Sequence, residues 1–369
     1  MVADLPQSRF FRTCYGIIAL LLIIFLVSKV SFLFNPLIKM FNILVVPFII
    51  AGFFYYLLRP LVNYLTKKHV NRTASILLIY LILAILTVLF SMVGWPTLRT
   101  QMEHFVHSVP QMVEAFKEQI RQLQQNRVFS MFAQNESDIS TKMSDYLDKG
   151  ITAASNYVTG LVSVVTNFVM IVATVPIILY YMLKESDHIP DSILAAIPQK
   201  YRRDGEQTLE EIDSALSGFI VGRVIITGLL GVMLYIGFLL IGLPYSLLLT
   251  VVSTVLNLIP YIGSILGAIP VLIVAFIHSP SMALWSMIVV IIAQQIESNL
   301  LSPHIYGKRL DIHPLTTIVL LLVAGDIGGI LGVILAIPGY MVAKIIIVRA
   351  YHLFFAGKVE EIADQPDKK

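Results

Sequence analysis

Ionisable and amide side chains are scarce in the apolar core of this chain, residues 218–349, and those present are the residues able to do chemistry. Residues 224–296 contain no Asp, Glu, Lys or Arg, and polar groups then gather at Gln294, Gln295, Glu297 and Asn299. Gln295 and Asn299 are four residues apart and share a helical face, whereas Glu297 lies roughly opposite. Polar groups facing lipid are costly. We therefore expect these side chains to point inward, along a solute or ion pathway.

Three further residues are candidates for the same pathway. Asp326 lies among glycines, where exposed backbone groups could join it in holding a cation or a proton. Arg223 precedes the uncharged run and could neutralise Glu297 or Asp326, while Asn257 could supply an amide to a polar solute. An interhelical salt bridge or a helix cap is the alternative, purely structural interpretation of each acid.

Two apolar blocks carry the glycines and prolines expected where a membrane helix is broken. Residues 257–270 read NLIPYIGSILGAIP and residues 325–339 read GDIGGILGVILAIPG. A turn at membrane depth survives only where protein shields it or where it lines a cavity, and paired breaks point to a transport site. Alternatively, the glycines let helices pack closely. The expected turn residues are Pro260, Gly263, Gly267, Gly325, Gly328, Gly329, Gly332 and Pro338.

The composition identifies the elements that must position these residues. The 369 residues are 57% hydrophobic and only 13% charged, where a soluble domain has about 25% charged residues. We predict an all-α, polytopic integral membrane protein with about eight membrane segments, two of the C-terminal blocks being broken hairpins. The expected divisions are an N-terminal tip with spans 1–3 (1–96), an amphipathic extracytoplasmic segment (97–156), a fourth span (157–183), a cytoplasmic helical segment (184–217), a core with broken helices (218–349) and a cytoplasmic tail (350–369).

Charge in the loops predicts the orientation. The loop at 59–72 has four basic residues and no acid, so the positive-inside rule places it, and both termini, in the cytoplasm of a bacterial cell. The segment 97–156 is then outside, with an apolar stripe that we expect to pack on neighbouring helices. The blocks 244–278 and 314–348 must each enter and leave on one side, either as two short crossings or as a re-entrant hairpin.

Enzymatic motifs are missing. The sequence has no HExxH, no GxSxG and no GxxxxGK[ST], which argues against a zinc protease, a serine hydrolase and an ATP-driven pump. Cys14 is the single cysteine, and the pair His104 and His107 is weak evidence for a metal site. We expect no catalytic activity, no cofactor and no metal. The small, dispersed net charge of +3 does not suggest a nucleic-acid partner.

Four segments resemble the autoinducer-2 exporter family, also called the PerM permease family. They are ALSGFIVGR (215–223), GLPYSLLLTVVSTVLNLIPYIGSILGAIP (242–270), QQIESNLLSPHIYGKRLDIHP (294–314) and GDIGGILGVILAIP (325–338). The layout of the whole chain is similar, with the specific motifs within about 215–340. By resemblance, the matching positions are Pro260, Gly263, Glu297, Asn299, Pro303, His313, Pro314, Gly329, Gly332 and Pro338.

The resemblance implies a transporter, and three functions remain open. The first is export, not driven by ATP, of a small polar metabolite such as autoinducer-2, held by amides and carbonyls. The second is Na⁺(Li⁺)/H⁺ antiport through Glu297 and Asp326. The third is a membrane scaffold without transport, which an exposed apolar stripe on 97–156 would favour. The expected partners are the lipid bilayer and either the polar solute or a monovalent cation with a proton, and small-residue faces make a homo-oligomer plausible.

Overall fold

The computed structural model describes residues 9–29, 31–124, 174–307 and 312–353, and within these ranges the chain is helical with no strand. The prediction of an all-α membrane protein is confirmed. Five helical stretches are long and apolar enough to cross a membrane: Ile43–Lys67, Arg72–Ser108, Gln199–Leu240, Pro280–Tyr306 and Leu331–Tyr351. Four shorter apolar helices accompany them, namely Thr174–Lys184, Ser246–Leu256, Ile262–His278 and Pro314–Gly329.

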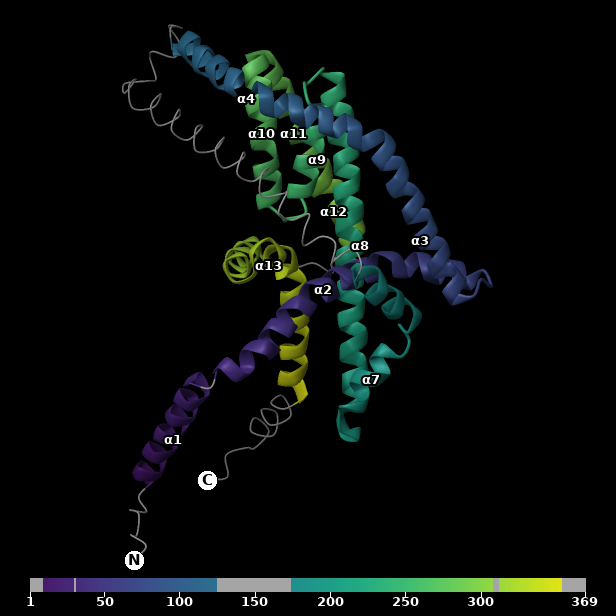
Figure 1. The fold of residues 1–369 in the computed structure, drawn as a ribbon, viewed down its shortest axis with the longest axis vertical. Helices are drawn as coiled ribbons and strands as arrows, with labels where there is room; N and C mark the ends of the chain where they lie inside the picture. The colour runs from purple at the N-terminus through teal and green to yellow at the C-terminus, as the bar shows by residue number, and fades with distance from the viewer. Residues whose placement is uncertain (1–8, 30, 125–173, 308–311, 354–369) are drawn as a thin grey trace, which may run out of the picture.

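The N-terminal helices form an extended arm and one edge of the molecule (Figure 1). Their bounds are α1 (Arg9–Lys29), α2 (Ser31–Lys67), α3 (Arg72–Leu89), the π-helical turn η1 (Phe90–Gly94) and α4 (Trp95–Gln124). Residue 30, between the end of α1 at Lys29 and the start of α2 at Ser31, lies outside the described residues. Residues 125–156 of the predicted outer segment, and most of the fourth span, lie outside the described residues.

The C-terminal half is built around the long helix α8 (Arg202–Leu240), beside which α9, α10 and α11 stand (Figure 1). The other elements are α7 (Ile189–Ala195), η2 (Gln199–Tyr201), α9 (Ser246–Leu256), α10 (Ile262–His278), α11 (Pro280–Ile296), the π-helical turn η3 (Glu297–Leu301), α12 (Ser302–Tyr306) and α13 (Pro314–Tyr351). The boundary expected after residue 217 falls inside α8, which runs without interruption from the polar segment into the apolar core.

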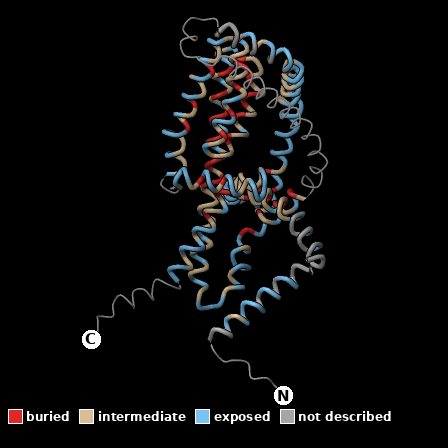
Figure 2. The backbone as a smooth tube through the Cα atoms, turned by 90° about the vertical axis from the view of Figure 1, so that its left-hand side faces the viewer, coloured by how far each residue is buried: buried red, intermediate tan, exposed pale blue. Residues whose placement is uncertain are grey.

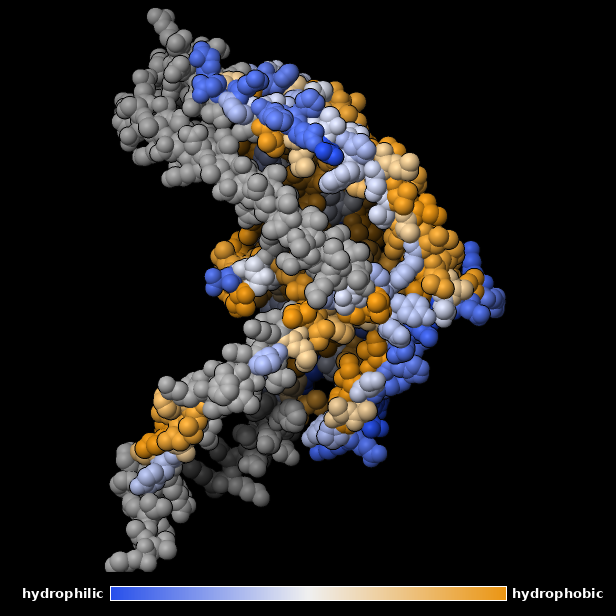
Figure 3. Space-filling model, in the orientation of Figure 1, coloured by the Kyte–Doolittle hydropathy of each residue, from blue (hydrophilic) through white to orange (hydrophobic). Residues whose placement is uncertain are grey.

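Buried residues collect between these helices (Figure 2), and apolar residues lie on the outer surface (Figure 3). One apolar core joins α2, α3 and the helix 174–184, and a second joins α8, α9, α10 and α11 around Phe238 and Leu230. The outer face of α3 exposes Leu77, Leu81 and Ile85. Contiguous apolar surface of this kind suits a lipid environment.

Helix α4 lies across the end of α9 and packs on it (Figure 1). The Phe105 ring meets the Tyr245 ring edge to face, with ring centroids 5.5 Å apart, and the Tyr245 hydroxyl donates to Ser108 Oγ at 3.2 Å. The Leu248 amide in the first turn of α9 donates to Gln101 Oε1 at 3.0 Å. The described start of the amphipathic segment is therefore packed, which argues against the scaffold interpretation.

The Gln101 contact predicts a stability effect. Gln101→Leu leaves the Leu248 amide without its acceptor at a helix N-terminus, where loss of a cap costs about 0.5–2 kcal/mol. We expect a lower thermal unfolding temperature of the purified protein in detergent. Gln111→Leu, at an exposed position of the same helix, is the control. Equal unfolding temperatures of the two variants would contradict a capping role.

Arg72 ties the start of α3 to the end of the helix 174–184. Its Nε donates to the Leu183 carbonyl at 2.8 Å, and its other nitrogens bond Ser186 and Asp187. Burial alone would raise the pKa of the Asp187 carboxyl, but the Arg72 hydrogen bond and charge outweigh it, and the pKa lies below its ordinary value.

The lowered pKa of Asp187 predicts a pH effect. A carboxyl whose folded-state pKa is lowered adds stability above its unfolded pKa, near about 3.9, and loses it as the pH falls through the folded value. In Asp187→Asn, the unfolding temperature should fall less steeply as the pH is lowered. The difference should be small because Asp187 is largely exposed. Parallel melting curves from pH 7 to pH 3 test this, and curves of identical slope would contradict it.

Candidate functional site

The first predicted break is a helical hairpin formed by α9 and α10. Helix α9 has 11 residues, so it is about 16 Å long, roughly half the thickness of the hydrocarbon core. The turn after it contains Pro260, and a Cβ on Gly263 would lie 1.9 Å from the Leu256 carbonyl oxygen. Gly267, expected at the turn, lies inside α10, where it packs on Ser253 of α9. This hairpin is too short on one side to cross a membrane twice.

The second predicted break divides α13 at Gly329, whose backbone has φ 57° and ψ −143°. The two limbs are Pro314–Gly329 and Leu331–Tyr351. A Cβ on Gly332 would lie 1.9 Å from the Ala324 carbonyl oxygen, and one on Gly325 would lie 3.0 Å from Val333, so the limbs meet closely at both positions. Pro338, expected at the break, lies within the second limb, where helix packing tolerates it.

Three polar residues from different helices meet beside the first hairpin. Glu297 begins η3, Asn257 is the C-cap residue directly after α9, and Arg223 lies in the middle of α8; their exposed fractions are 7%, 2% and 8%. Asn257 Nδ2 lies 3.3 Å from both Glu297 carboxylate oxygens, and Arg223 Nη1 lies 3.4 Å from Glu297 Oε1. Arg223 Nη2 also donates to the Asn257 carbonyl. We call Arg223, Asn257 and Glu297 the buried cluster.

The buried cluster is electrically balanced but incompletely hydrogen-bonded. One guanidinium offsets one carboxylate, which a buried charge requires. Arg223 Nε, Thr227 Oγ1 one turn further along α8, and the Tyr306 hydroxyl are buried without a hydrogen-bond partner in the part of the chain that the structure describes. Buried polar groups are normally satisfied, and exceptions call for an explanation. Unpaired groups beside the cluster are available to a polar solute.

The remaining predicted residues lie elsewhere. Asn299 Nδ2 donates to Gln295 Oε1 at 2.6 Å, so the two residues share a helical face as expected. That face is exposed, so the expectation that these two side chains point inward is wrong in this structure. Gln294 is half-buried. Asp326 is exposed near the break in α13, and neither a hydrogen bond nor an ion pair joins it to another described residue. The structure thus unites Arg223 with Glu297 and leaves Asp326 apart.

Sequence reasoning missed Thr227 and Tyr306. The Tyr306 ring packs on Gly222, where a Cβ would lie 2.7 Å from Tyr306 Cε1. It also stacks on Phe219, with ring centroids 6.2 Å apart and an interplanar angle of 14°. Tyr306 ends α12, inside the motif QQIESNLLSPHIYGKRLDIHP. Its place in that motif could have marked Tyr306 as a candidate site residue, although the pattern does not show that the ring turns toward Arg223.

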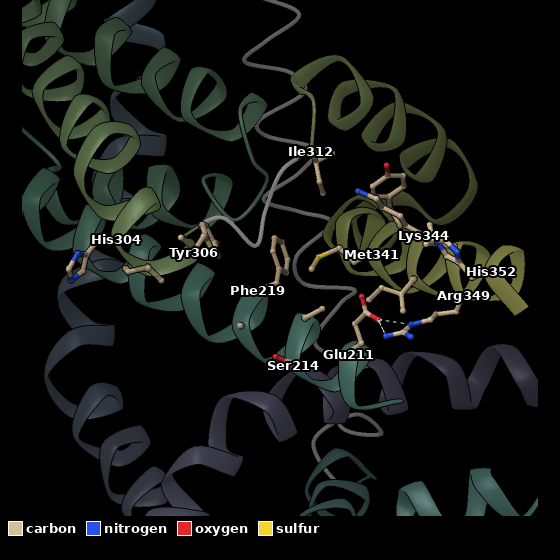
Figure 4. Close-up of a pocket in the computed structure, with 17 residues that line it drawn as sticks. Glu211, Ser214, Phe219, His304, Tyr306, Ile312, Met341, Lys344, Arg349 and His352 are labelled. Carbon is tan, nitrogen blue, oxygen red and sulfur yellow. Dashed lines mark hydrogen bonds and ion pairs between the residues drawn. The ribbon is translucent and has the colours of Figure 1, made fainter. Parts of the chain in front are cut away.

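Tyr306 also lines a cavity of about 950 Å³ (Figure 4). Its walls come from the first half of α8, from α12 and from the second limb of α13. Phe219 and Tyr306 line it; Phe219 belongs to α8, which also carries Arg223, and the Tyr306 ring packs on Gly222 of the same helix. The Tyr306 ring thus borders the cavity and also contacts Gly222, the residue before Arg223.

Comparisons with known proteins give one result. The sequence model of the AI-2E family transporter matches residues 18–351. YueF of Bacillus subtilis is 40% identical over 94% of this chain and 96% of its own length, and YrrI of the same species is 30% identical over 89% and 92%. YhhT of Escherichia coli K12 is 24% identical over 82% of this chain and 83% of its own. All three are named as candidate transport proteins. With helices of membrane-spanning length and two helix breaks in its core, the chain belongs to the AI-2E transporter family.

Proposed function

We propose that the protein exports a small polar metabolite of the autoinducer-2 type across a bacterial cytoplasmic membrane. The observation that carries the proposal is the buried cluster at the end of the short helix α9. Its net charge is zero, and it offers a carboxylate, an amide and a guanidinium. A neutral, hydroxyl-rich solute can bind such a site through hydrogen bonds without leaving a buried charge unpaired.

The spare groups around the cluster support a solute site. Thr227 Oγ1 and Arg223 Nε are hydrogen-bonding groups that no described residue uses. A solute hydroxyl could donate to the former and accept from the latter. Since the cluster lies where α9 ends in a turn, a change in the hairpin would alter its access. Broken helices at binding sites serve secondary transporters in this way.

The arrangement of the helices also supports the proposed orientation. The start of α1 and the end of α13 lie toward the same end of the molecule, and α4 lies at the opposite end (Figure 1). This agrees with cytoplasmic termini and an outer segment at 97–156, as the basic loop at 59–72 predicts. Reporter fusions at the two termini, read for cytoplasmic activity, test the proposal.

Efflux from proteoliposomes tests the export function. Vesicles loaded with labelled autoinducer-2 should lose the label faster with the purified protein than without it. Unlabelled solute outside should accelerate the loss if the carrier exchanges. Protein-free vesicles measure the passive leak of the solute, and retention of labelled sucrose measures the integrity of the vesicles. Equal efflux from both vesicle types, with the protein shown to be folded, would overturn the proposal.

Na⁺(Li⁺)/H⁺ antiport is the second candidate because Glu297 is a carboxylate buried beside a helix break. In this mechanism, Arg223 would pair with Glu297 in the ion-free state and release it to a cation or proton. Vesicles with an internal pH dye and an imposed proton gradient should respond to added Na⁺ or Li⁺. A response that disappears in Glu297→Gln would establish exchange. A flat trace with folded protein would leave export as the stronger proposal.

A further inference from the structure

The cavity beside Tyr306 has the size and the mixed lining of a ligand pocket. Its volume, about 950 Å³, lies within the range of small-molecule sites, about 300–1,000 Å³. One wall is apolar, with Phe219 and Met341 lying side by side on it (Figure 4). Met341 and Phe219 are buried in the same small apolar core. An apolar chain or ring would therefore bury its surface against this wall.

The opposite end of the cavity carries an excess of positive charge. Among the lining residues, Lys344 and Arg349 are cationic at neutral pH and Glu211 is anionic. Arg349 forms an ion pair with Glu211. Its Nη2 and its Nε donate to the same carboxylate oxygen, at 3.0 Å and 3.1 Å. Lys344 has no ion pair within the described residues. Among the described lining residues, one cation facing the cavity is thus uncompensated, and the neutral pair beside it joins α8 to α13.

We propose that this cavity binds an anionic amphiphile, with the phosphate or carboxylate on Lys344 and the apolar part against Phe219 and Met341. The site is separate from the buried cluster and does not depend on the proposed transport function. Two sources share this chemistry. An anionic lipid could insert its headgroup, since basic pockets near helix ends bind such groups. A soluble anionic metabolite could enter the same space.

Titration of the whole protein in phosphatidylcholine nanodiscs tests the site. Octyl phosphate is the probe, octyl glucoside is the neutral amphiphile and inorganic phosphate is the anion without a chain. Octyl phosphate should bind at least about tenfold more tightly than either, because it alone uses both the charge and the apolar wall. Lys344→Gln should weaken octyl phosphate about five- to tenfold and leave octyl glucoside unchanged. Lys344 is exposed at the cavity surface, so this variant should fold.

Lys200→Gln is the matched control, since Lys200 lies in η2, is exposed and does not line the cavity. It should bind octyl phosphate like the unmodified protein. Repeating the titration in phosphatidylglycerol discs separates the sources. Weaker apparent binding of octyl phosphate there identifies the lipid as the occupant, and unchanged binding identifies a soluble anion. Equal binding to Lys344→Gln and the unmodified protein, or equal affinity for octyl glucoside, would overturn the proposal.

Discussion

Replacing Glu297 by glutamine should stop transport and destabilise the protein, and a second substitution at Arg223 should restore only the stability. Glu297→Gln leaves the Arg223 guanidinium buried without its carboxylate. Breaking a buried ion pair from one side costs about 3–5 kcal/mol. Arg223→Gln leaves the carboxylate unpaired and should cost a similar amount. The double variant removes both charges and should recover most of the lost unfolding temperature.

The efflux rate of the double variant distinguishes a solute-binding role of the Arg223–Glu297 pair from a purely structural one. If the buried cluster holds the solute, efflux from proteoliposomes stays abolished in the stable double variant, because the carboxylate and the guanidinium are both gone. If the pair is only an interhelical salt bridge, efflux returns with stability. The melting temperature and the efflux rate are measured on the unmodified protein, the two single variants and the double variant, which together complete a double-mutant cycle. If the melting temperature and the efflux rate both recover in the double variant, the buried cluster is not part of the transport mechanism.

A second ion pair supplies the control. Arg59 Nη1 lies 2.6 Å and 2.7 Å from the two carboxylate oxygens of Asp213, joining α2 to α8 outside the buried cluster. This pair is only partly buried, so its removal should cost less than loss of the Arg223 pair. Arg59→Gln together with Asp213→Asn should leave the efflux of the surviving folded protein near normal. This control separates general helix packing from the chemistry of the site.

The sequence was sufficient to predict the helix breaks and to limit the partner of Arg223 to two acids. Pro260 and Gly329 mark the turns because proline lacks an amide hydrogen and glycine tolerates a positive φ, which are local properties. Arg223 was expected to neutralise Glu297 or Asp326, since few charges exist in the apolar core and a buried charge needs a partner. The structure pairs it with Glu297. Helical periodicity likewise separated the face of Gln295 from that of Glu297.

Contacts that depend on tertiary packing could not be predicted from the sequence. Arg59 and Asp213 are 154 residues apart, and the periodicity of each helix gives the face of a residue without naming its partner. Asp326 was grouped with Glu297 because both are acids within apolar blocks. The break in α13 instead leaves Asp326 exposed and apart from the cluster. The cavity beside Tyr306 depends on three helices whose relative placement no local pattern encodes.

Adding one methyl group to either hairpin should be among the most damaging substitutions in the chain. A Cβ on Gly263 would lie 1.9 Å from the Leu256 carbonyl oxygen, and one on Gly332 would lie 1.9 Å from the Ala324 carbonyl oxygen. The obstructing atoms belong to the backbone, so no side-chain rotation relieves the clash. Gly263→Ala and Gly332→Ala should each cost more than about 3 kcal/mol. We expect a large loss of unfolding temperature and of correctly folded protein in the membrane.

Matched glycines decide whether close packing is the reason. Gly228 in α8 and Gly328 in α13 have open space where a Cβ would stand. Gly228→Ala should stabilise its helix by about 0.5–1 kcal/mol, since glycine is a poor helix former. Gly328→Ala should have little effect although it lies four residues from Gly332. If Gly332→Ala and Gly328→Ala lower the unfolding temperature equally, the flexibility of this segment matters, and the close approach of the two limbs does not explain the glycine at 332.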